Sequence, residues 1–246
     1  MFAEEEPERR IGVLAPRTVI EYQPYEFYKL APPGVVLAQV ACGLEEYSTD
    51  EVERVFAPLD RLLDLLMEHE IELLVQTGVP LPLLIGRAAY DAILDHIRER
   101  TGLPVTSQID NVIAGMKHLG CHKVVVANKW SDAMNGTLGE ILHMEGIALV
   151  GIYNKSLSPR ESGRISDLDK ARLVYDLGLK ALAEHPDADA LYVGGGSWKA
   201  QPCAEQLETA TGRPIISNVN AMVRHLLDLL GIWQPIAGHG RLLGSA

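Results

Sequence analysis

The residues best suited to chemistry lie in the stretch 189–199, which reads Asp-Ala-Leu-Tyr-Val-Gly-Gly-Gly-Ser-Trp-Lys. Residues 190–193 have the composition of a buried strand, and three glycines and a hydroxyl group follow at once. A strand that ends in bare backbone presents N–H groups with no side chain in the way, as a small anion requires. The same glycines also suit a tight turn. The stretch predicts an anion site only if the rest of the chain supports one.

Three other strand-like segments end in residues that could contact the same anion. The apolar segments 11–16, 71–75 and 123–127 each lead into a short polar or proline-containing turn. The carboxyl ends of parallel strands meet at one edge of a sheet, where α/β proteins bind their ligands. We therefore expect these turns to converge with the glycine stretch on one cleft. The residues concerned are Pro16, Gln76, Thr77, Gly78, Asn128, Lys129, Trp130, Ser131, Gly194, Gly195, Gly196 and Ser197, and Arg17 follows directly after Pro16 at the same strand end.

Strand-like and helix-like segments alternate along the whole chain. The expected strands are 11–16, 35–40, 71–75, 104–107, 123–127, 147–153, 190–193 and 214–217. The expected helices are 48–70, 88–100, 109–119, 132–145, 169–184, 203–211 and 220–230, with a polar loop at 154–167. The strands are apolar runs without a period of two, so a parallel sheet covered on both faces is the expected result.

The chain also contains a coarse internal repeat. Each half has a strand that ends in a polar glycine turn, then a helix, a Thr-Gly-x-Pro turn, a further strand and a further helix; the turns are residues 101–104 and 211–214. This pattern predicts a duplicated α/β protein with two pseudo-symmetric, Rossmann-like halves and an active site in the cleft between them. The approximate division is 1–107 plus 220–246 for the first half and 108–219 for the second.

The composition of the chain argues against several classes of binding partner. The chain has 246 residues, 47% of them hydrophobic, enough for one large core or two small ones. The net charge of −11 argues against nucleic acid and anionic membranes, and no apolar run approaches the length of a membrane span. The acidic N-terminus lacks the apolar core of a signal peptide, and three cysteines without metal spacing suit reduced thiols in the cytoplasm. His118 and His122 are four residues apart, but Gly120 between them argues against a helical metal pair.

The chain resembles the aspartate/glutamate racemase superfamily, and most closely its arylmalonate decarboxylase and maleate isomerase branch. The resemblance covers nearly the whole chain and is carried by Gly-Val-Leu-Ala-Pro at 12–16, Thr-Gly-Leu-Pro-Val-Thr at 101–106, the strand 124–127 with Trp130, the glycines 194–196, Thr-Gly-Arg-Pro-Ile-Ile-Ser at 211–217 and Gly-His-Gly-Arg-Leu at 238–242. It implies two pseudo-symmetric α/β halves that each donate one functional residue, and no metal or organic cofactor.

The resemblance also implies where the functional residues of the superfamily would lie. Racemases and isomerases use two cysteines as proton donor and acceptor, whereas arylmalonate decarboxylases keep only the cysteine of the second half. The first position falls at Gln76, with Gly78 as the alternative, and the second falls at Gly194; neither is a thiol. Another acid is therefore required. The ionisable candidates near the motifs are Lys129, Lys199, Tyr192, for which core packing is the competing role, and His239, for which a loop role competes.

The anion pocket of the family, by contrast, has matching residues. Thr77 corresponds to the family's hydroxyl donor in the first half. Trp130 stands where the decarboxylases have a tyrosine that contacts the substrate carboxylate, and its indole N–H can donate a hydrogen bond but cannot transfer a proton. The remaining contacts implied for a substrate carboxylate are Gly195 and Gly196 as amide donors, Ser197 as a hydroxyl, and Pro16, Arg17 and Gly78 at the strand ends.

The resemblance, with these residues, thus implies a decarboxylase-like lyase, independent of cofactors, that would act on a small malonate-type or arylmalonate-type dicarboxylate. The reaction would pass through an enediolate held in a dioxyanion hole. An isomerase or racemase, including a maleate-isomerase-like enzyme with a non-cysteine acid or base, is the alternative. A carboxylate binder without catalysis, and a lyase that hydrates or eliminates with water held by Gln76 and Ser197, also stay open, as does assembly into a homo-oligomer.

Overall fold

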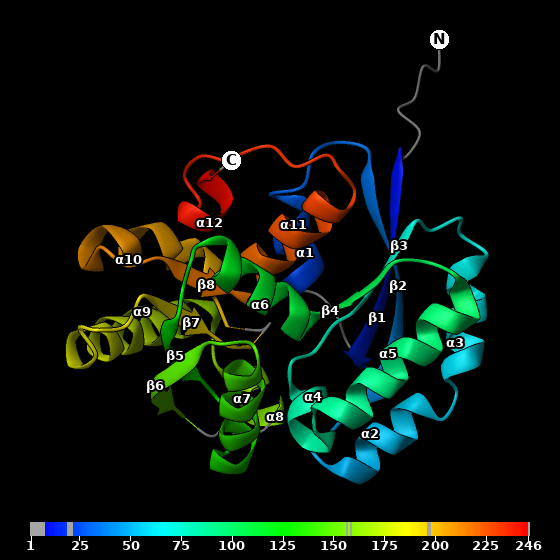
Figure 1. The fold of residues 1–246 in the computed structure, drawn as a ribbon, viewed down its shortest axis with the longest axis horizontal. Coiled ribbons are helices and arrows are strands. Elements are labelled where there is room, and N and C mark those ends of the chain that lie inside the picture. The colour runs from blue at the N-terminus through cyan, green and yellow to red at the C-terminus, as the bar shows by residue number, and fades with distance from the viewer. Residues whose placement is uncertain (1–7, 19–21, 156, 158, 196–197, 246) are drawn as a thin grey trace. The chain divides into compact units, whose positions relative to one another are not determined.

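The computed structural model describes residues 8–18, 22–155, 157, 159–195 and 198–245. The chain divides into two compact units, Met1–Gln108 and Ile109–Ala246. Each unit has a sheet of four parallel strands flanked by helices, in the order β2-β1-β3-β4 in the first unit and β6-β5-β7-β8 in the second (Figure 1). The predicted fold class, two α/β halves with parallel sheets, is confirmed.

The first unit begins with the central strand of its sheet. Its strands are β1 (Arg9–Arg17), β2 (Val35–Leu44), β3 (Leu73–Gln76) and β4 (Val105–Ser107). Its helices are α1 (Tyr22–Tyr28), α2 (Thr49–Phe56), α3 (Leu59–Met67), α4 (Pro80–Ile85) and α5 (Arg87–Thr101). The whole of β3 is buried, which explains why its sequence is a short apolar run rather than an alternating pattern.

The second unit repeats this order. Its strands are β5 (Lys123–Asn128), β6 (Ala148–Asn154), β7 (Ala190–Val193) and β8 (Ile215–Ser217). Its helices are α7 (Asp132–Met144), α8 (Pro159–Arg164), α9 (Asp167–Glu184), the 3₁₀ turn η1 (Gln201–Cys203), α10 (Ala204–Thr211), α11 (Asn218–Leu229) and α12 (Arg241–Gly244), and α6 (Gln108–His118) leads into the unit. No helix in the described part of the chain is long and apolar enough to cross a membrane.

The order of the strands fixes which turns lie together within each unit. In both sheets the chain leaves the first strand for a neighbour on one side and then returns to pair the third strand on the other side. The connections therefore diverge at the carboxyl ends of β1 and β3, and again at those of β5 and β7. Ligands of open α/β sheets bind at such switch points. The pairs Leu14 with Gln76 and Ala127 with Val193 bring the predicted turns together inside each unit.

Most of the predicted elements are confirmed to within a few residues, and the differences involve proline and short helices. The predicted helix 48–70 is two helices, because Pro58 lies between α2 and α3. Short α1, α4 and α12 were not predicted, and the predicted loop 154–167 contains α8. Helix α4 has Pro80 at its first position, where a missing N–H costs nothing, although the two prolines in its six residues resemble a loop.

The C-terminal segment groups differently from the predicted division, which assigned 220–246 to the first half; in the structure it belongs to the second unit. Helix α11 starts directly from β8, with Ser217 and Asn220 forming a reciprocal capping box. Leu242 and Leu243 of α12 are fully buried, and a Cβ built on Gly115 of α6 would lie 3.0 Å from a methyl group of Leu242. Continuous packing from β8 through α11 to α12 accounts for the grouping.

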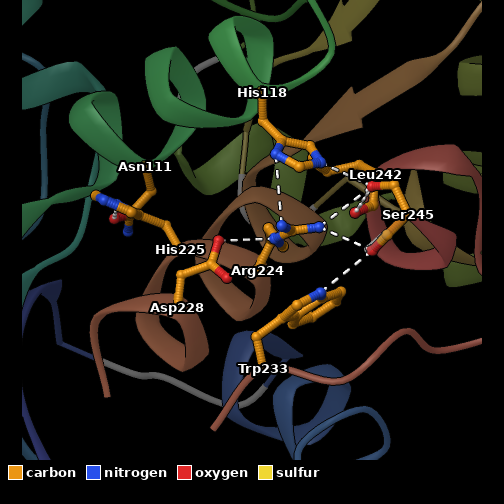
Figure 2. A network of polar contacts seen from close by, with 8 residues as sticks. All are labelled: Asn111, His118, Arg224, His225, Asp228, Trp233, Leu242 and Ser245. Carbon is orange, nitrogen blue, oxygen red and sulfur yellow. Dashed lines mark hydrogen bonds and ion pairs between the residues drawn. The ribbon is translucent and has the colours of Figure 1, made fainter. Parts of the chain in front are cut away.

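A polar network centred on Arg224 holds this C-terminal segment (Figure 2). The Arg224 guanidinium donates to the Ser245 carbonyl oxygen at 3.0 Å and pairs with Asp228 at 2.7 Å, while it lies 4.3 Å from the Trp233 ring. The Trp233 indole N–H donates to the same carbonyl at 3.2 Å. His118 contacts Arg224 through Nδ1 at 3.4 Å and the Ser245 hydroxyl through Nε2 at 2.8 Å. Because the guanidinium can only donate, Nδ1 of His118 accepts, which requires a neutral ring.

This network makes stability depend on pH. Burial, and next the charge of Arg224, lower the pKa of His118, and burial lowers the pKa of His225. The unfolded chain therefore binds more protons than the folded chain as the pH falls below the ordinary histidine value of about 6.5, so this part of the stability is present above that pH and lost below it. We expect the urea-unfolding free energy to be lower at pH 5.5 than at pH 8, with a smaller difference in His118→Gln. His143→Gln, at an exposed site on α7, serves as the control and should keep the wild-type difference.

Candidate active site

The glycine stretch after β7 is held against the neighbouring strand. The Gly194 amide donates to the Ala127 carbonyl oxygen at 2.9 Å, which extends the ladder between β5 and β7 by one residue. Gly195 has a φ of +119°, a conformation that favours glycine, and its carbonyl oxygen accepts from the Trp198 amide at 3.1 Å. Gly196 and Ser197, two of the predicted carboxylate contacts, lie outside the described residues. The described part of the stretch is thus a buried turn from strand to loop.

The indole of Trp130 lies where a side chain on Gly194 would have to go. A Cβ built on Gly194 would lie 2.6 Å from Cη2 and 2.8 Å from Cζ3 of Trp130. Neither contact is to a flexible chain end, because both atoms belong to a rigid ring that is 1% exposed. The glycine at position 194 and the tryptophan at position 130 therefore depend on one another: the ring occupies the volume that a larger residue would need.

Three asparagine side chains, two of them buried and one half-buried, hold the backbone of Trp130. Its N–H donates to the side chain of Asn128 at 3.0 Å, and its carbonyl oxygen accepts from the side chains of Asn135 at 3.3 Å and Asn154 at 3.1 Å. The Asn128 side chain donates in turn to Asn135 at 2.6 Å. The predictions named neither Asn135 nor Asn154, although the polar residues after β5 and on the first turn of α7 were a signal. A loop held in this way presents its side chains on a rigid frame.

The indole N–H of Trp130 is a buried donor with no hydrogen-bond partner among the described residues. An unsatisfied buried donor costs about 1–3 kcal/mol, so such groups are rare unless a ligand or a water satisfies them. The donor belongs to a residue at the switch point of the second sheet, where a ligand is expected on topology alone. The two observations together make this end of the sheet the candidate binding site.

Lys129 lies beside the same turn. It follows the last residue of β5, it is 3% exposed, and its Cε is 3.4 Å from the position that a Cβ on Gly195 would take. Its carbonyl oxygen accepts from the Leu157 amide at 2.9 Å. An ammonium group brought so deep into a protein is compatible with folding when negative charge is placed near it. Lys129 therefore places a buried amino group at this end of the sheet, next to the Gly195 turn.

Lys199, the second candidate acid, is engaged elsewhere in the unit. Its ammonium group is 3.0 Å from Oδ2 of Asp167, while Lys170 of α9 lies 3.5 Å from Oδ1 of the same carboxylate. Both lysine side chains are nearly buried, at 11% and 10% exposure, and Lys199 lowers the pKa of Asp167. The ion pair connects the end of the glycine stretch to the start of α9. Lys199 therefore has a structural partner that the sequence did not suggest.

In the first unit, Gln76 is tied into the core. Its side-chain amide donates to the Thr77 carbonyl oxygen, and its oxygen accepts from the hydroxyl of Tyr90, a fully buried residue of α5. Gln76 itself has no exposed surface. Both ends of its amide are used inside the protein, so Gln76 is not arranged to move a proton or to hold a reacting water.

The neighbours of Gln76 form a closely packed turn. The Thr77 amide and hydroxyl both face the Leu14 carbonyl oxygen, at 2.9 and 3.4 Å. Gly78 has a φ of +105°, and a Cβ there would lie 2.5 Å from the ring of Pro16, so backbone and space both require glycine. Pro16, Thr77 and Gly78 are thus brought together at the end of β1 and β3, as the sheet order implies.

Arg17 lies at the same end of β1 and is half-buried. It contacts Tyr47, where its positive charge and hydrogen bond lower the pKa of the phenol and oppose the larger effect of burial, which raises it. A guanidinium beside a phenol at a strand end keeps a fixed positive charge near the turn. The structure therefore gives Arg17 an internal partner in addition to any ligand.

The other ionisable candidates make hydrogen bonds inside the protein, and the three thiols have raised pKa values. Tyr192 is fully buried and donates to Asn218 at 2.8 Å, and burial raises the pKa of its phenol. The carbonyl oxygen of His239 accepts from Gln201 at 3.2 Å. Burial raises the pKa of each of the three thiols to about 11, whereas a reactive cysteine needs a lowered pKa; these residues are Cys42, Cys121 and Cys203.

Comparisons with known proteins show similarity in sequence and in fold. A family model described as arylmalonate decarboxylase matches residues 12–243. The arylmalonate decarboxylase of Bordetella bronchiseptica is 28% identical over 170 residues, which cover 69% of this chain and 70% of that protein. A structure of unliganded arylmalonate decarboxylase is similar with a TM-score of 0.82 and 23% identity, covering 97% of this chain and all of the other. The maleate cis–trans isomerase of Nocardia farcinica, in a structure with a covalently bound succinylcysteine intermediate, is similar with a TM-score of 0.82 and 17% identity, covering 96% and 98%.

Proposed function

Because the chain belongs to the arylmalonate decarboxylase family, we propose that it is a cofactor-independent decarboxylase of small malonate-type dicarboxylates, with aryl-substituted malonates as the first substrates to test. Its relatives are enzymes that decarboxylate or isomerise small carboxylates. The observation that carries the proposal is the buried indole N–H of Trp130, which has no hydrogen-bond partner among the described residues, on a ring that packs against Gly194 next to the contact of Lys129 with Gly195. A donor, a cation and a glycine turn at one switch point suit a carboxylate better than a neutral ligand.

In the proposed reaction one carboxylate stays bound and the other leaves. We propose that the retained carboxylate accepts hydrogen bonds from Trp130 and from the Gly195 amide. The resemblance to the family adds the Gly196 amide and the Ser197 hydroxyl as donors, and these two residues lie outside the described part of the chain. In the first unit we propose substrate contacts at Pro16, Arg17, Thr77 and Gly78. The bond between the α-carbon and the leaving carboxylate breaks, carbon dioxide departs, and the electron pair passes into the retained carboxylate to form an enediolate. Fixed donors stabilise that charge, and each is worth a few kcal/mol in a site without bulk water.

The main alternative, isomerisation by a thiol, has less support. The maleate isomerase of Nocardia farcinica has been seen with a succinyl group on a cysteine. Here the positions that carry over from the superfamily are Gln76 and Gly194, and the Trp130 ring fills the space beside Gly194. The three cysteines have raised pKa values rather than the lowered values of nucleophiles. Covalent addition to a double bond therefore lacks an evident nucleophile.

A panel of three substrate classes distinguishes these hypotheses. The protein would be incubated with phenylmalonate and alkylmalonates, with maleate, and with single enantiomers of aspartate and glutamate. We expect carbon dioxide release from at least one malonate, measured with a coupled bicarbonate assay, and no isomerisation of maleate or racemisation of the amino acids. Fumarate from maleate would favour the isomerase. Saturable binding of malonates by calorimetry without turnover of any compound would favour a binder and contradict the proposal.

A further inference from the structure

We propose that Lys129 is the proton donor of this reaction. In the superfamily that the chain resembles, a cysteine has this role. The inference rests on the proposed function, because it assigns the acid for a carbanion that decarboxylation would create. The inference identifies the acid. A different acid is needed because position 194, where the superfamily has a cysteine, is a glycine that packs against Trp130. Nothing larger than glycine fits at position 194 while the Trp130 ring stays in place.

The position of Lys129 carries the first step of the argument. The side chain lies against Gly195, whose backbone turn belongs to the proposed carboxylate site, and it is 3% exposed. A proton donor must reach the α-carbon, which is one bond from the retained carboxylate. The structure places the Lys129 side chain within contact distance of the Gly195 turn. This contact makes Lys129 the candidate among the ionisable residues described near the glycine stretch.

The rigidity of the segment is the second step. Two backbone hydrogen bonds fix the chain at Lys129. The Lys155 amide donates to the Asn128 carbonyl oxygen at 3.1 Å, and the Leu157 amide donates to the Lys129 carbonyl oxygen at 2.9 Å. The asparagines around Trp130 continue this frame. A donor must be held within a fraction of an ångström of its productive position, and a lysine side chain alone is too flexible for that. The fixed backbone and the close packing supply the constraint.

The other candidates are less suitable for the same role. Lys199 is paired at 3.0 Å with Asp167, the first residue of α9, so its ammonium group is directed to that helix. The Tyr192 hydroxyl already donates to Asn218, and burial raises its pKa. The Trp130 indole can donate a hydrogen bond but does not release its proton. An ammonium group both attracts the developing negative charge and has a proton to give.

The step balances in atoms and charge. Loss of carbon dioxide from the malonate dianion leaves an enediolate with two negative charges. The N–H bond of the Lys129 ammonium breaks, a C–H bond forms at the α-carbon, and the product is a monocarboxylate with one negative charge. Lys129 is left as a neutral amine, which regains a proton from water and returns hydroxide to the solution. Because the donor lies on one side of the carbanion, a substrate with two different α-substituents gives one enantiomer in excess.

The test uses 2-methyl-2-phenylmalonate, whose product is chiral, with the full-length protein and three variants. We expect Lys129→Met to reduce kcat by about 100-fold or more, the usual contribution of a general acid, and to give a nearly racemic product because solvent then supplies the proton. Lys129→Arg keeps the charge but holds its proton too tightly, so KM should stay within a few-fold while kcat falls. We also expect the wild-type rate to fall at alkaline pH, where the amine loses the proton it must give, and this fall to be absent from Lys129→Arg. Lys199→Met should keep the wild-type enantiomeric excess.

Folding is checked separately. Circular dichroism and thermal unfolding of Lys129→Met and Lys129→Arg show whether each variant is folded under the conditions of the activity assay. Wild-type turnover with unchanged rate, enantiomeric excess and pH profile in both Lys129 variants would overturn this inference and leave the proposed decarboxylation intact. A loss of enantiomeric excess in Lys199→Met instead would assign the proton to Lys199. If the wild type itself releases no carbon dioxide from any malonate, the proposed function is wrong and this inference falls with it.

Discussion

Gly194→Cys, which restores a thiol at the position that carries over from the superfamily, is expected to destabilise the protein by about 1–3 kcal/mol, the usual cost of forcing extra atoms into a packed interior. The reason is local. The new Cβ would lie 2.6 Å from the Trp130 ring, and that ring cannot move aside easily because three asparagine side chains hold its backbone. The unfolding free energy from urea titration, followed by circular dichroism, measures the effect.

The matched control for this prediction removes the ring. In a double-mutant cycle with Trp130→Phe, the cost of Gly194→Cys should fall by more than about 1 kcal/mol, because the smaller ring frees the volume that the thiol needs. An equal cost in both backgrounds would show that the ring is not the obstacle. The same pair of variants tests the chemistry, since only the doubly substituted protein has both a thiol and room for it.

Gly195→Ala is expected to reduce kcat/KM for malonate decarboxylation by about 100-fold, the effect of losing one donor to a developing oxyanion. Position 195 has a φ of +119°, which an alanine rarely adopts, so the turn must change its backbone conformation. Any such change moves the amide that is proposed to face the carboxylate. It also moves the surface against which Lys129 packs, since a Cβ would lie 3.4 Å from Cε of that side chain.

Gly212→Ala separates catalysis from stability in this experiment. Gly212 ends α10 in the left-handed conformation, with a φ of +69°, and it belongs to the same unit. A Cβ added there would meet no described atom within 4 Å. The substitution should cost about 1 kcal/mol of stability through its backbone, as at position 195, and leave kcat/KM unchanged. Equal losses of activity in the two variants would mean that Gly195 acts through folding alone.

Local signals in the sequence were sufficient for the fold. The two Thr-Gly-x-Pro turns correspond to Gly102 and Gly212, which end α5 and α10 with φ values of +68° and +69°, so the repeat reflects a real structural equivalence. Glycine in the left-handed conformation and proline after a helix act within a few residues, and a single sequence contains them. The short helices escaped prediction because α4 and α8 have too few residues for a periodic pattern.

The candidate site was predictable in its location but not in its contacts. Strand ends and sheet order follow from the alternation of apolar segments, and they place Lys129, Trp130 and Gly195 at a switch point. The packing of Trp130 on Gly194 depends on two side-chain positions 64 residues apart in sequence, and the pairing of Gln76 with Tyr90 depends on a helix and a strand. The Lys199–Asp167 pair likewise joins separate elements. Contacts of this kind are set by three-dimensional packing, for which one sequence carries no direct signal.

The central claim is that this chain forms a carbanion next to a bound carboxylate and protonates it. The most direct measurement follows phenylmalonate labelled with carbon-13 at its carboxyl groups, in deuterium oxide, by NMR. The account predicts that labelled carbon dioxide or bicarbonate appears together with phenylacetate carrying solvent deuterium on its α-carbon, one deuteron added per molecule of carbon dioxide released. Catalysed turnover of the substrate to any product without loss of the labelled carboxyl group, or no turnover at all with the folded protein, would contradict it.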